Sequence, residues 1–167
     1  MSKIIWIISG PSVVGKSHFK ALKSDRLSEI VDYRTDKLEI FDPTSDGDEF
    51  NFLKRNESVF LYHIDLVHFG DELDNKKYGF KNLFSTPFEK KVIILGVPYN
   101  EYKERFQTLG KLDERKNKIK NRYLIHKKYV EWVDKLKQQN IPYIFVEAKN
   151  QYKILKEKEF FKMISYE

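Results

Sequence analysis

The chain has no cysteine, only 7 glycines and 5 prolines in 167 residues, and no long run of apolar residues. The lack of cysteine excludes a disulfide scaffold, a thiol nucleophile and any cysteine-ligated metal site, and it fits a reducing compartment. No segment reaches the roughly 18–20 apolar residues that a membrane-spanning helix needs. The apolar run at 4–8 is too short for the core of a signal peptide. We therefore expect a cytoplasmic protein without a membrane partner. The abundance of Lys, Asn, Ile, Phe and Tyr is typical of AT-rich genomes, which include viral and bacterial ones. If the protein is viral, the expected location is the cytoplasm of the host cell.

The chain does contain enough apolar and aromatic residues for a packed core. Hydrophobic residues make up 41% of it, with 13 Phe and 10 Tyr, which argues against intrinsic disorder. The length corresponds to about one domain. No repeat and no Pro-, Gly- or Ser-rich linker divides the sequence, so we predict a single domain over residues 1–167.

The positive charge is concentrated in one part of the sequence. The formal net charge is +6, and residues 101–140 carry 12 basic and 6 acidic residues, so the remainder is neutral. Residues 115–128 contain 7 basic residues and no acid. Such a block suits a polyanion, such as nucleotide phosphates, nucleic acid or an acidic partner. The alternative is a solvated helix face.

Apolar segments of strand length alternate with segments of helical periodicity. We expect strands at 3–9, 34–41, 59–64, 91–97 and 141–148, and helices at 16–24, 100–109, 119–139 and 150–164, with Asn100 as an N-cap. The alternation predicts an α/β fold with a mostly parallel central sheet flanked by helices. Right-handed crossovers bring the loops after the strands to one edge of the sheet, where ligands bind.

The strongest motif follows the first predicted strand. Residues 10–17, Gly-Pro-Ser-Val-Val-Gly-Lys-Ser, match G-x-x-x-x-G-K-[ST] between an apolar strand and a helical pattern. Gly10 and Gly15 permit backbone angles that other residues resist, so consecutive N–H groups can surround a phosphate at a helix N-terminus. We predict that Lys16 reaches the β- and γ-phosphates of ATP and that the Ser17 hydroxyl coordinates Mg²⁺. The cofactor-binding residues predicted here are Gly10, Ser12, Val13, Val14, Gly15, Lys16 and Ser17.

This loop resembles the phosphate loop of guanylate kinases, which typically reads GPSGVGKS, with Val13 here at the place of the third glycine. Residues 97–105, VPYNEYKER, are similar to a Val-Pro, six-residue, Arg pattern in the wider group of small P-loop nucleoside and nucleotide kinases. The resemblance implies a three-layer P-loop NTPase fold and a kinase that uses ATP and Mg²⁺. Residues 25–58 carry no recognisable version of the base-binding region of guanylate kinases, so the resemblance does not assign guanine as the acceptor.

The resemblance also gives the basic segment a role. In these kinases a basic lid lies between the helix after the third strand and the next long helix, here residues 110–122. Mobile Arg and Lys side chains stabilise the charge that moves during phosphoryl transfer. Arg115 and Arg122 share a face if the stretch is helical, and Arg105 ends the preceding helix. We predict these three arginines as catalytic residues together with Lys16.

An acid at a strand end completes the predicted site. Asp65 follows the apolar run 59–64, where its carboxylate would hold Mg²⁺ through water or accept the proton of an acceptor hydroxyl. We predict it as a catalytic and metal residue; a turn or N-cap aspartate is the alternative, and Asp42 is the rival acid. After the last predicted strand, the resemblance implies contacts with the adenine base at residues 148–150, and Lys149 is predicted on that cofactor-binding side.

These features predict an ATP- and Mg²⁺-dependent phosphotransferase that moves the γ-phosphoryl group to a nucleoside or a nucleoside monophosphate. The first alternative is a kinase acting on a polynucleotide or a modified nucleobase, in which the positive charge follows the nucleic-acid backbone. The second is a nucleotide-binding switch or ATPase without an acceptor. Switch proteins usually carry a second acid directly after the aspartate at the strand end. Because Asp65 is followed by Leu66 instead, the sequence favours a kinase over this second alternative.

Overall fold

The structure, a computed structural model, describes residues 4–11, 14–15, 30, 39–41, 59–66, 87–108, 122–149 and 152–165, and at 39–41, 59–65, 106, 108, 122 and 123 it describes the backbone alone. The strands are β1 (Ile4–Gly10), β2 (Glu39–Phe41), β3 (Val59–Asp65), β4 (Glu89–Gly96), β5 (Tyr143–Glu147) and β6 (Lys153–Leu155). The helices are α5 (Tyr99–Thr108), α7 (Arg122–Gln138) and α8 (Glu157–Ser165).

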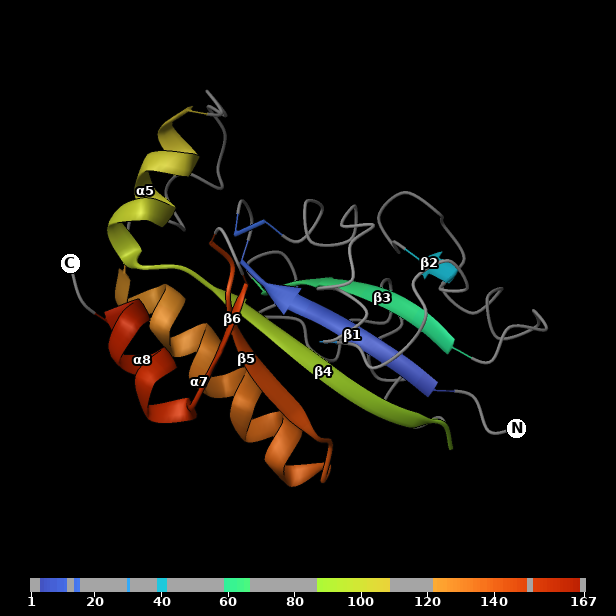
Figure 1. The fold of residues 1–167 in the computed structure, drawn as a ribbon. Helices are drawn as coiled ribbons and strands as arrows, with labels where there is room; N and C mark the ends of the chain where they lie inside the picture. The colour runs from blue at the N-terminus through green and yellow to red at the C-terminus, as the bar shows by residue number, and fades with distance from the viewer. Residues whose placement is uncertain are drawn as a thin grey trace.

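The strands form one six-stranded sheet in the order β2-β3-β1-β4-β5-β6 (Figure 1). All neighbours pair in parallel except β5 and β6, which are antiparallel. The predicted α/β fold with a mostly parallel sheet is therefore confirmed. The central strand β1 lies between β3 and β4, and its last residue, Gly10, lies opposite Asp65 at the end of β3.

Strand predictions are accurate for three short apolar runs. The segments expected at 3–9, 59–64 and 91–97 correspond closely to β1, β3 and β4, and β5 is a shorter version of 141–148. In β1 and β4, successive residues that point to opposite faces of the sheet are buried, as expected for central parallel strands. Of the strand expected at 34–41, the structure describes only β2.

The helix expected at 150–164 is wrong in its first part. Residues 153–155 form β6, which reverses direction and pairs with β5 through Phe145 and Leu155. The helix α8 begins only at Glu157, where the Glu159 carboxylate accepts a 3.0 Å hydrogen bond from the N–H of Lys156. That bond satisfies one backbone donor at the helix start, which is one half of a capping box.

Two further helix ends differ from or add to the expectations. Asn100 is not an N-cap, because α5 already begins at Tyr99 and the Pro98 carbonyl accepts the 3.0 Å hydrogen bond from Tyr102 N–H. The end of α7 has a Schellman arrangement: Ile141 N–H donates to Leu136 O and Asn140 adopts a φ of 53°. An asparagine tolerates this left-handed conformation better than most residues, and the chain turns there toward β5.

Helices α7 and α8 cover one face of the sheet (Figure 1). The Trp132 indole of α7 donates a 2.9 Å hydrogen bond to Ser9 Oγ, which in turn donates one of 3.0 Å to Ile93 O. The hydroxyl of Tyr129 donates a 2.7 Å bond to Leu95 O near the end of β4. These buried bonds fix α7 against the two central strands, because unpaired polar groups there would be costly.

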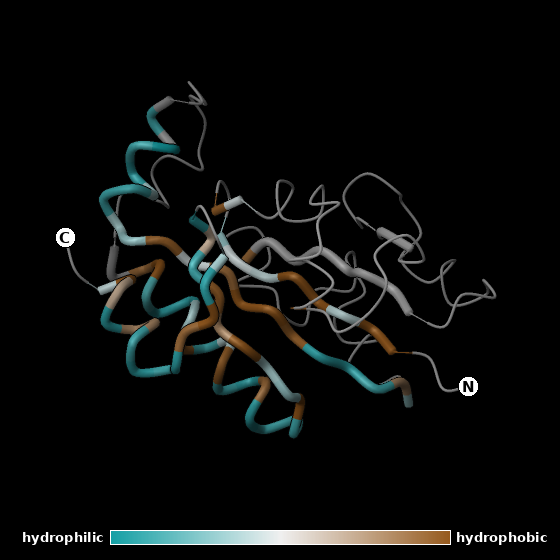
Figure 2. The backbone as a smooth tube through the Cα atoms, viewed as in Figure 1, coloured by the Kyte–Doolittle hydropathy of each residue, from teal (hydrophilic) through white to brown (hydrophobic). Residues whose placement is uncertain are grey.

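The packing of α8 explains a glycine at the end of β4. A Cβ at Gly96 would lie 2.5 Å from the ring of Phe160, so only glycine allows this close approach of helix and strand. Figure 2 shows hydrophobic residues along β1 and the carboxyl-terminal half of β4, whereas β4 begins with hydrophilic residues. The hydrophobic core thus follows β1 along its length and the carboxyl-terminal half of β4. No described helix is long and apolar enough to cross a membrane.

Candidate functional site

The sheet topology places a switch point at the carboxyl ends of β1 and β4. The chain leaves β1 toward β2 on one side of the sheet, and it leaves β4 toward β5 on the other side. Ligands of open α/β sheets bind where the connections diverge in this way. The sequence motif that begins at Gly10 therefore starts at the position that topology alone assigns to a ligand.

Each of the two loop glycines is needed for a different physical reason. Gly15 has a φ of +106°, which confirms that it adopts backbone angles that other residues resist. Gly10 does not have a positive φ; instead, a Cβ there would lie 2.7 Å from Val14 Cγ1 and 3.0 Å from Leu95 O. Residue 10 must therefore be a glycine, as predicted, but the reason is close packing and not an unusual backbone conformation.

The described part of the loop folds back on itself. The N–H of Val14 donates a 3.4 Å hydrogen bond to Pro11 O, and the Val14 side chain is completely buried. This turn directs the chain back beside the end of β4.

Arg105, in the last turn of α5, joins this loop to the segment that follows β5. Its Nη1 donates a 3.0 Å hydrogen bond to Val14 O, and its Nη2 donates one of 3.0 Å to Ala148 O. Nη2 also contacts Glu101 Oε1 at 2.6 Å, a partly buried ion pair. The structure therefore brings Arg105 to the loop, and its guanidinium contacts protein acceptors there.

Glu101 is shared between two cations. Its second oxygen, Oε2, lies 3.2 Å from Lys149 Nζ, and Lys149 is the half-exposed member of the cluster. We call Glu101, Arg105 and Lys149 the loop cluster. Ala148 N–H donates a 2.8 Å bond to Gly96 O, which anchors the cluster to the end of β4.

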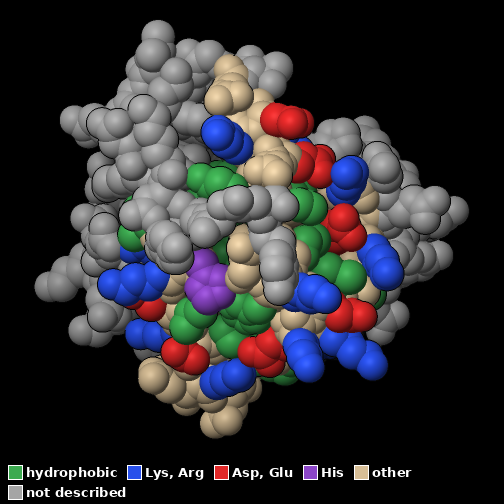
Figure 3. All heavy atoms as spheres, turned by 90° about the vertical axis from the view of Figure 1, so that its left-hand side faces the viewer, with side chains coloured by type: hydrophobic (Ala, Val, Ile, Leu, Met, Phe, Trp, Pro, Cys, Tyr) green, Lys and Arg blue, Asp and Glu red, His purple; other side chains and the backbone are tan. Residues whose placement is uncertain are grey.

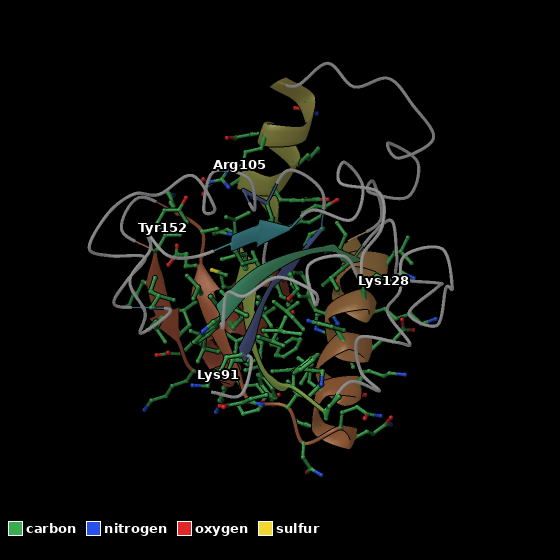
Figure 4. All side chains as sticks on the ribbon, turned by 90° about the vertical axis from the view of Figure 1, so that its right-hand side faces the viewer. Lys91, Arg105, Lys128 and Tyr152 are labelled. Atoms are coloured by element: carbon green, nitrogen blue, oxygen red, sulfur yellow. The ribbon has the colours of Figure 1, made fainter. Side chains whose placement is uncertain are left out.

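Tyr152 adjoins this cluster through a backbone hydrogen bond to Lys149. Figure 4 shows Arg105 and Tyr152 at one end of the molecule, with Lys91 at the opposite end of the sheet. Tyr152 has a φ of 50°, and its N–H donates a 3.0 Å bond to Lys149 O. Burial raises the pKa of its phenol, and the nearby charge of Arg105 partly offsets that rise. A left-handed, buried, non-glycine residue is strained, and such strain often occurs at functional sites.

Asp65 ends β3, as the sequence predicts. Its backbone lies in register with Gly10, so the two strand ends that carry the predicted acid and the predicted loop are neighbours. The side chain of Asp65 lies outside the described residues, and so does the rival, Asp42. Among the side chains that are described, no group of three or more His, Asp or Glu residues could hold a metal ion.

Other predicted residues fall beyond the parts of the chain that the structure describes. They are Ser12, Val13, Lys16, Ser17, Arg115 and Asn150, together with the predicted helix at 16–24 and most of the predicted lid. Arg122 is the first residue of α7, with its backbone alone described. Because α7 runs back to the start of β5, the first residue of α7 lies toward the edge of the sheet at which the parallel strands end.

Sequence reasoning missed Glu101 and Tyr152. For Glu101 a signal existed, because its spacing of four residues from Arg105 on a predicted helix favours an ion pair. For Tyr152 no local signal exists, since the sequence there continues a helical pattern.

Neither a scan against protein-family models nor a search of curated proteins finds a match for this chain.

Proposed function

We propose that the protein is an ATP- and Mg²⁺-dependent phosphotransferase that transfers the γ-phosphoryl group to a nucleoside or a nucleoside monophosphate. One observation carries the proposal. The sequence GPSVVGKS begins at the end of the central parallel strand, at the topological switch point, with Gly15 at a φ of +106°. Motif, topology and backbone conformation each support the proposal of a phosphate-binding loop in a fold of the P-loop NTPase kind.

The residues of the chain divide the work as follows. Lys16 neutralises the β- and γ-phosphates, and N–H groups of the loop other than that of Val14, which donates to Pro11 O, hold the phosphate oxygens. Ser17 and Asp65 are the residues that would hold Mg²⁺, which neutralises charge on the phosphates. The carboxylate of Asp65 alternatively accepts the proton of the acceptor hydroxyl. Arg115 and Arg122 stabilise the charge on the transferred group.

The charges on α7 favour a small acceptor over a polynucleotide. Lys127 lies 3.7 Å from Glu131, and Lys137 lies 3.2 Å from Glu157 of α8. Figure 3 shows Lys and Arg interspersed with Asp and Glu over the face that carries α8. A surface that binds a nucleic-acid backbone by its charge needs a continuous basic stripe. Among the residues that the structure describes, basic side chains alternate with acidic ones, which supports binding of phosphates at one site rather than along a polynucleotide.

The test is ATP consumption with Mg²⁺ in the presence of nucleosides, nucleoside monophosphates and oligonucleotides. Stimulation by a monomer supports the proposal, and stimulation by oligonucleotides alone favours the polynucleotide kinase. Turnover that no acceptor changes would contradict both. Lys16→Ala is expected to abolish turnover, while Lys127→Ala, on the exposed part of α7, is the matched control and should retain it.

A further inference from the structure

The hydrogen bond from Arg105 to Val14 O determines the direction of the next N–H group. The peptide unit between Val14 and Gly15 is trans, as are all peptide bonds in the described residues, so its N–H points opposite to its C=O. Arg105 Nη1 lies 3.0 Å from that carbonyl oxygen. The N–H of Gly15 therefore points away from the guanidinium, on the other side of the loop.

We infer that Arg105 is a positioning residue that aims the Gly15 N–H at a phosphate and does not itself bind that phosphate. This inference rests on the proposed function, because it needs a phosphate at the loop. Glu101 orients the guanidinium from the preceding turn of α5, and the carbonyl of Ala148 fixes its other side. The position of the phosphate loop is thereby linked to the segment after β5.

The hydrogen-bonding capacity of Arg105 supports this role. A guanidinium has five N–H donors, and Nη2 directs its contacts to Ala148 O and to Glu101 Oε1, while Nη1 contacts Val14 O. A phosphate that approached Arg105 directly would also approach the carboxylate of Glu101, which lies 2.6 Å from Nη2. Electrostatic repulsion by this anion disfavours direct binding.

Glu101→Gln distinguishes a positioning role from direct phosphate binding, because the two roles predict opposite changes in the affinity for Mg²⁺–ATP. If Arg105 positions the loop, loss of the carboxylate loosens the guanidinium, and binding of Mg²⁺–ATP weakens by about tenfold, the usual scale for a charged hydrogen bond. If Arg105 binds the phosphate itself, loss of the neighbouring anion strengthens binding. Stronger or unchanged binding in isothermal titration calorimetry would therefore overturn the inference.

The matched control is Glu131→Gln, which removes another carboxylate from an i,i+4 ion pair, on α7. Its affinity for Mg²⁺–ATP should equal that of the wild type. Arg105→Lys provides a second variant, since lysine keeps the charge but loses the planar fork that reaches two carbonyls. A positioning role predicts weaker binding in Arg105→Lys, whereas a simple charge contact would survive.

A spectroscopic readout follows the Gly15 N–H directly. Gly15 is the only one of the 7 glycines that follows a valine, so ¹³C-carbonyl valine combined with ¹⁵N-glycine selects this one amide signal. At saturating Mg²⁺–ATP the signal should shift equally in the wild type and in Glu131→Gln, and less in Arg105→Lys. An equal shift in Arg105→Lys would refute positioning.

The two proposals fail in different ways. If the wild type binds no Mg²⁺–ATP, the proposed function itself fails. If the wild type binds Mg²⁺–ATP and Glu101→Gln binds it more tightly, the proposed function is not contradicted, and Arg105 is a direct phosphate ligand. Circular dichroism of each variant shows whether weaker binding comes from unfolding, and the amide signal of a folded variant then decides between the roles.

Discussion

Gly10 and Asp65 are parallel-sheet partners at the carboxyl ends of β1 and β3. The first residue of the proposed phosphate loop and the predicted acid therefore start from adjacent backbone positions, although they are far apart in the sequence. Parallel pairing is what makes this possible, because both strands end at the same edge. The register thus brings together two features that were predicted separately.

Asp65→Asn is expected to lower the rate of phosphoryl transfer while leaving ATP binding nearly intact. A carboxylate that acts as a base or holds the metal contributes about 10²–10⁴-fold to the rate, and asparagine keeps the size but not the charge. Steady-state kinetics and calorimetry measure the two effects. The control is Asp134→Asn on the exposed side of α7; a normal rate in Asp65→Asn would make Asp65 a structural residue.

Gly10→Ala is expected to lose both stability and ATP binding. The added methyl group would lie 2.7 Å from Val14 Cγ1 and 3.0 Å from Leu95 O, so the loop must move. Overpacking of this kind costs about 1–3 kcal/mol. Urea denaturation and calorimetry with Mg²⁺–ATP measure the two losses.

Gly96→Ala provides the comparison. Its methyl group would meet the ring of Phe160 on α8 at 2.5 Å, so it should also destabilise the protein. The clash is with a core ring rather than with the loop, and the folded variant should bind ATP normally. Equal losses of binding in both variants would mean that the Gly10 contact has no specific effect on the loop.

The sequence predicts the strands and the loop because their signals are local. An apolar run such as 91–97 is sufficient to indicate a buried strand, and GPSVVGKS has its glycines at fixed spacing. The contact of Arg105 with Val14 joins residues 91 positions apart, so it depends on how β1 and β4 pair. No pattern within one segment contains that information.

The error at 150–164 has a similar origin. The amphipathic pattern of α8 is genuine, but the three residues of β6 are held by pairing with β5, and the turn before them places Tyr152 at a φ of 50°. A tyrosine in that conformation is unfavourable by itself. Tertiary packing, which buries the Tyr152 side chain, overrides the local preference.

Ser9→Ala is expected to destabilise the protein by about 1–3 kcal/mol, because it leaves the buried indole N–H of Trp132 without its acceptor. Trp132→Phe removes the donor and opens a cavity. Each single variant loses the hydrogen bond, and the double variant loses the same bond only once. The sum of the two single losses of stability should therefore exceed the loss in the double variant. Urea denaturation of the four proteins measures the coupling. Additive effects would show that the bond between Ser9 and Trp132 contributes little.

Tyr152 predicts a specific loss of stability in alkali. Burial raises the pKa of its phenol above the ordinary value of 10.0 in the folded state, whereas the unfolded chain keeps that ordinary value. Between these two pKa values the folded state binds more protons than the unfolded state, so the free energy of unfolding falls as pH rises. The stabilisation is complete below pH 10 and is lost through this window. In Tyr152→Phe that component of the slope should be absent. Urea denaturation from pH 9 to about pH 11 compares the two proteins, and identical slopes would mean that the phenol ionises as readily in the folded protein as in the unfolded chain.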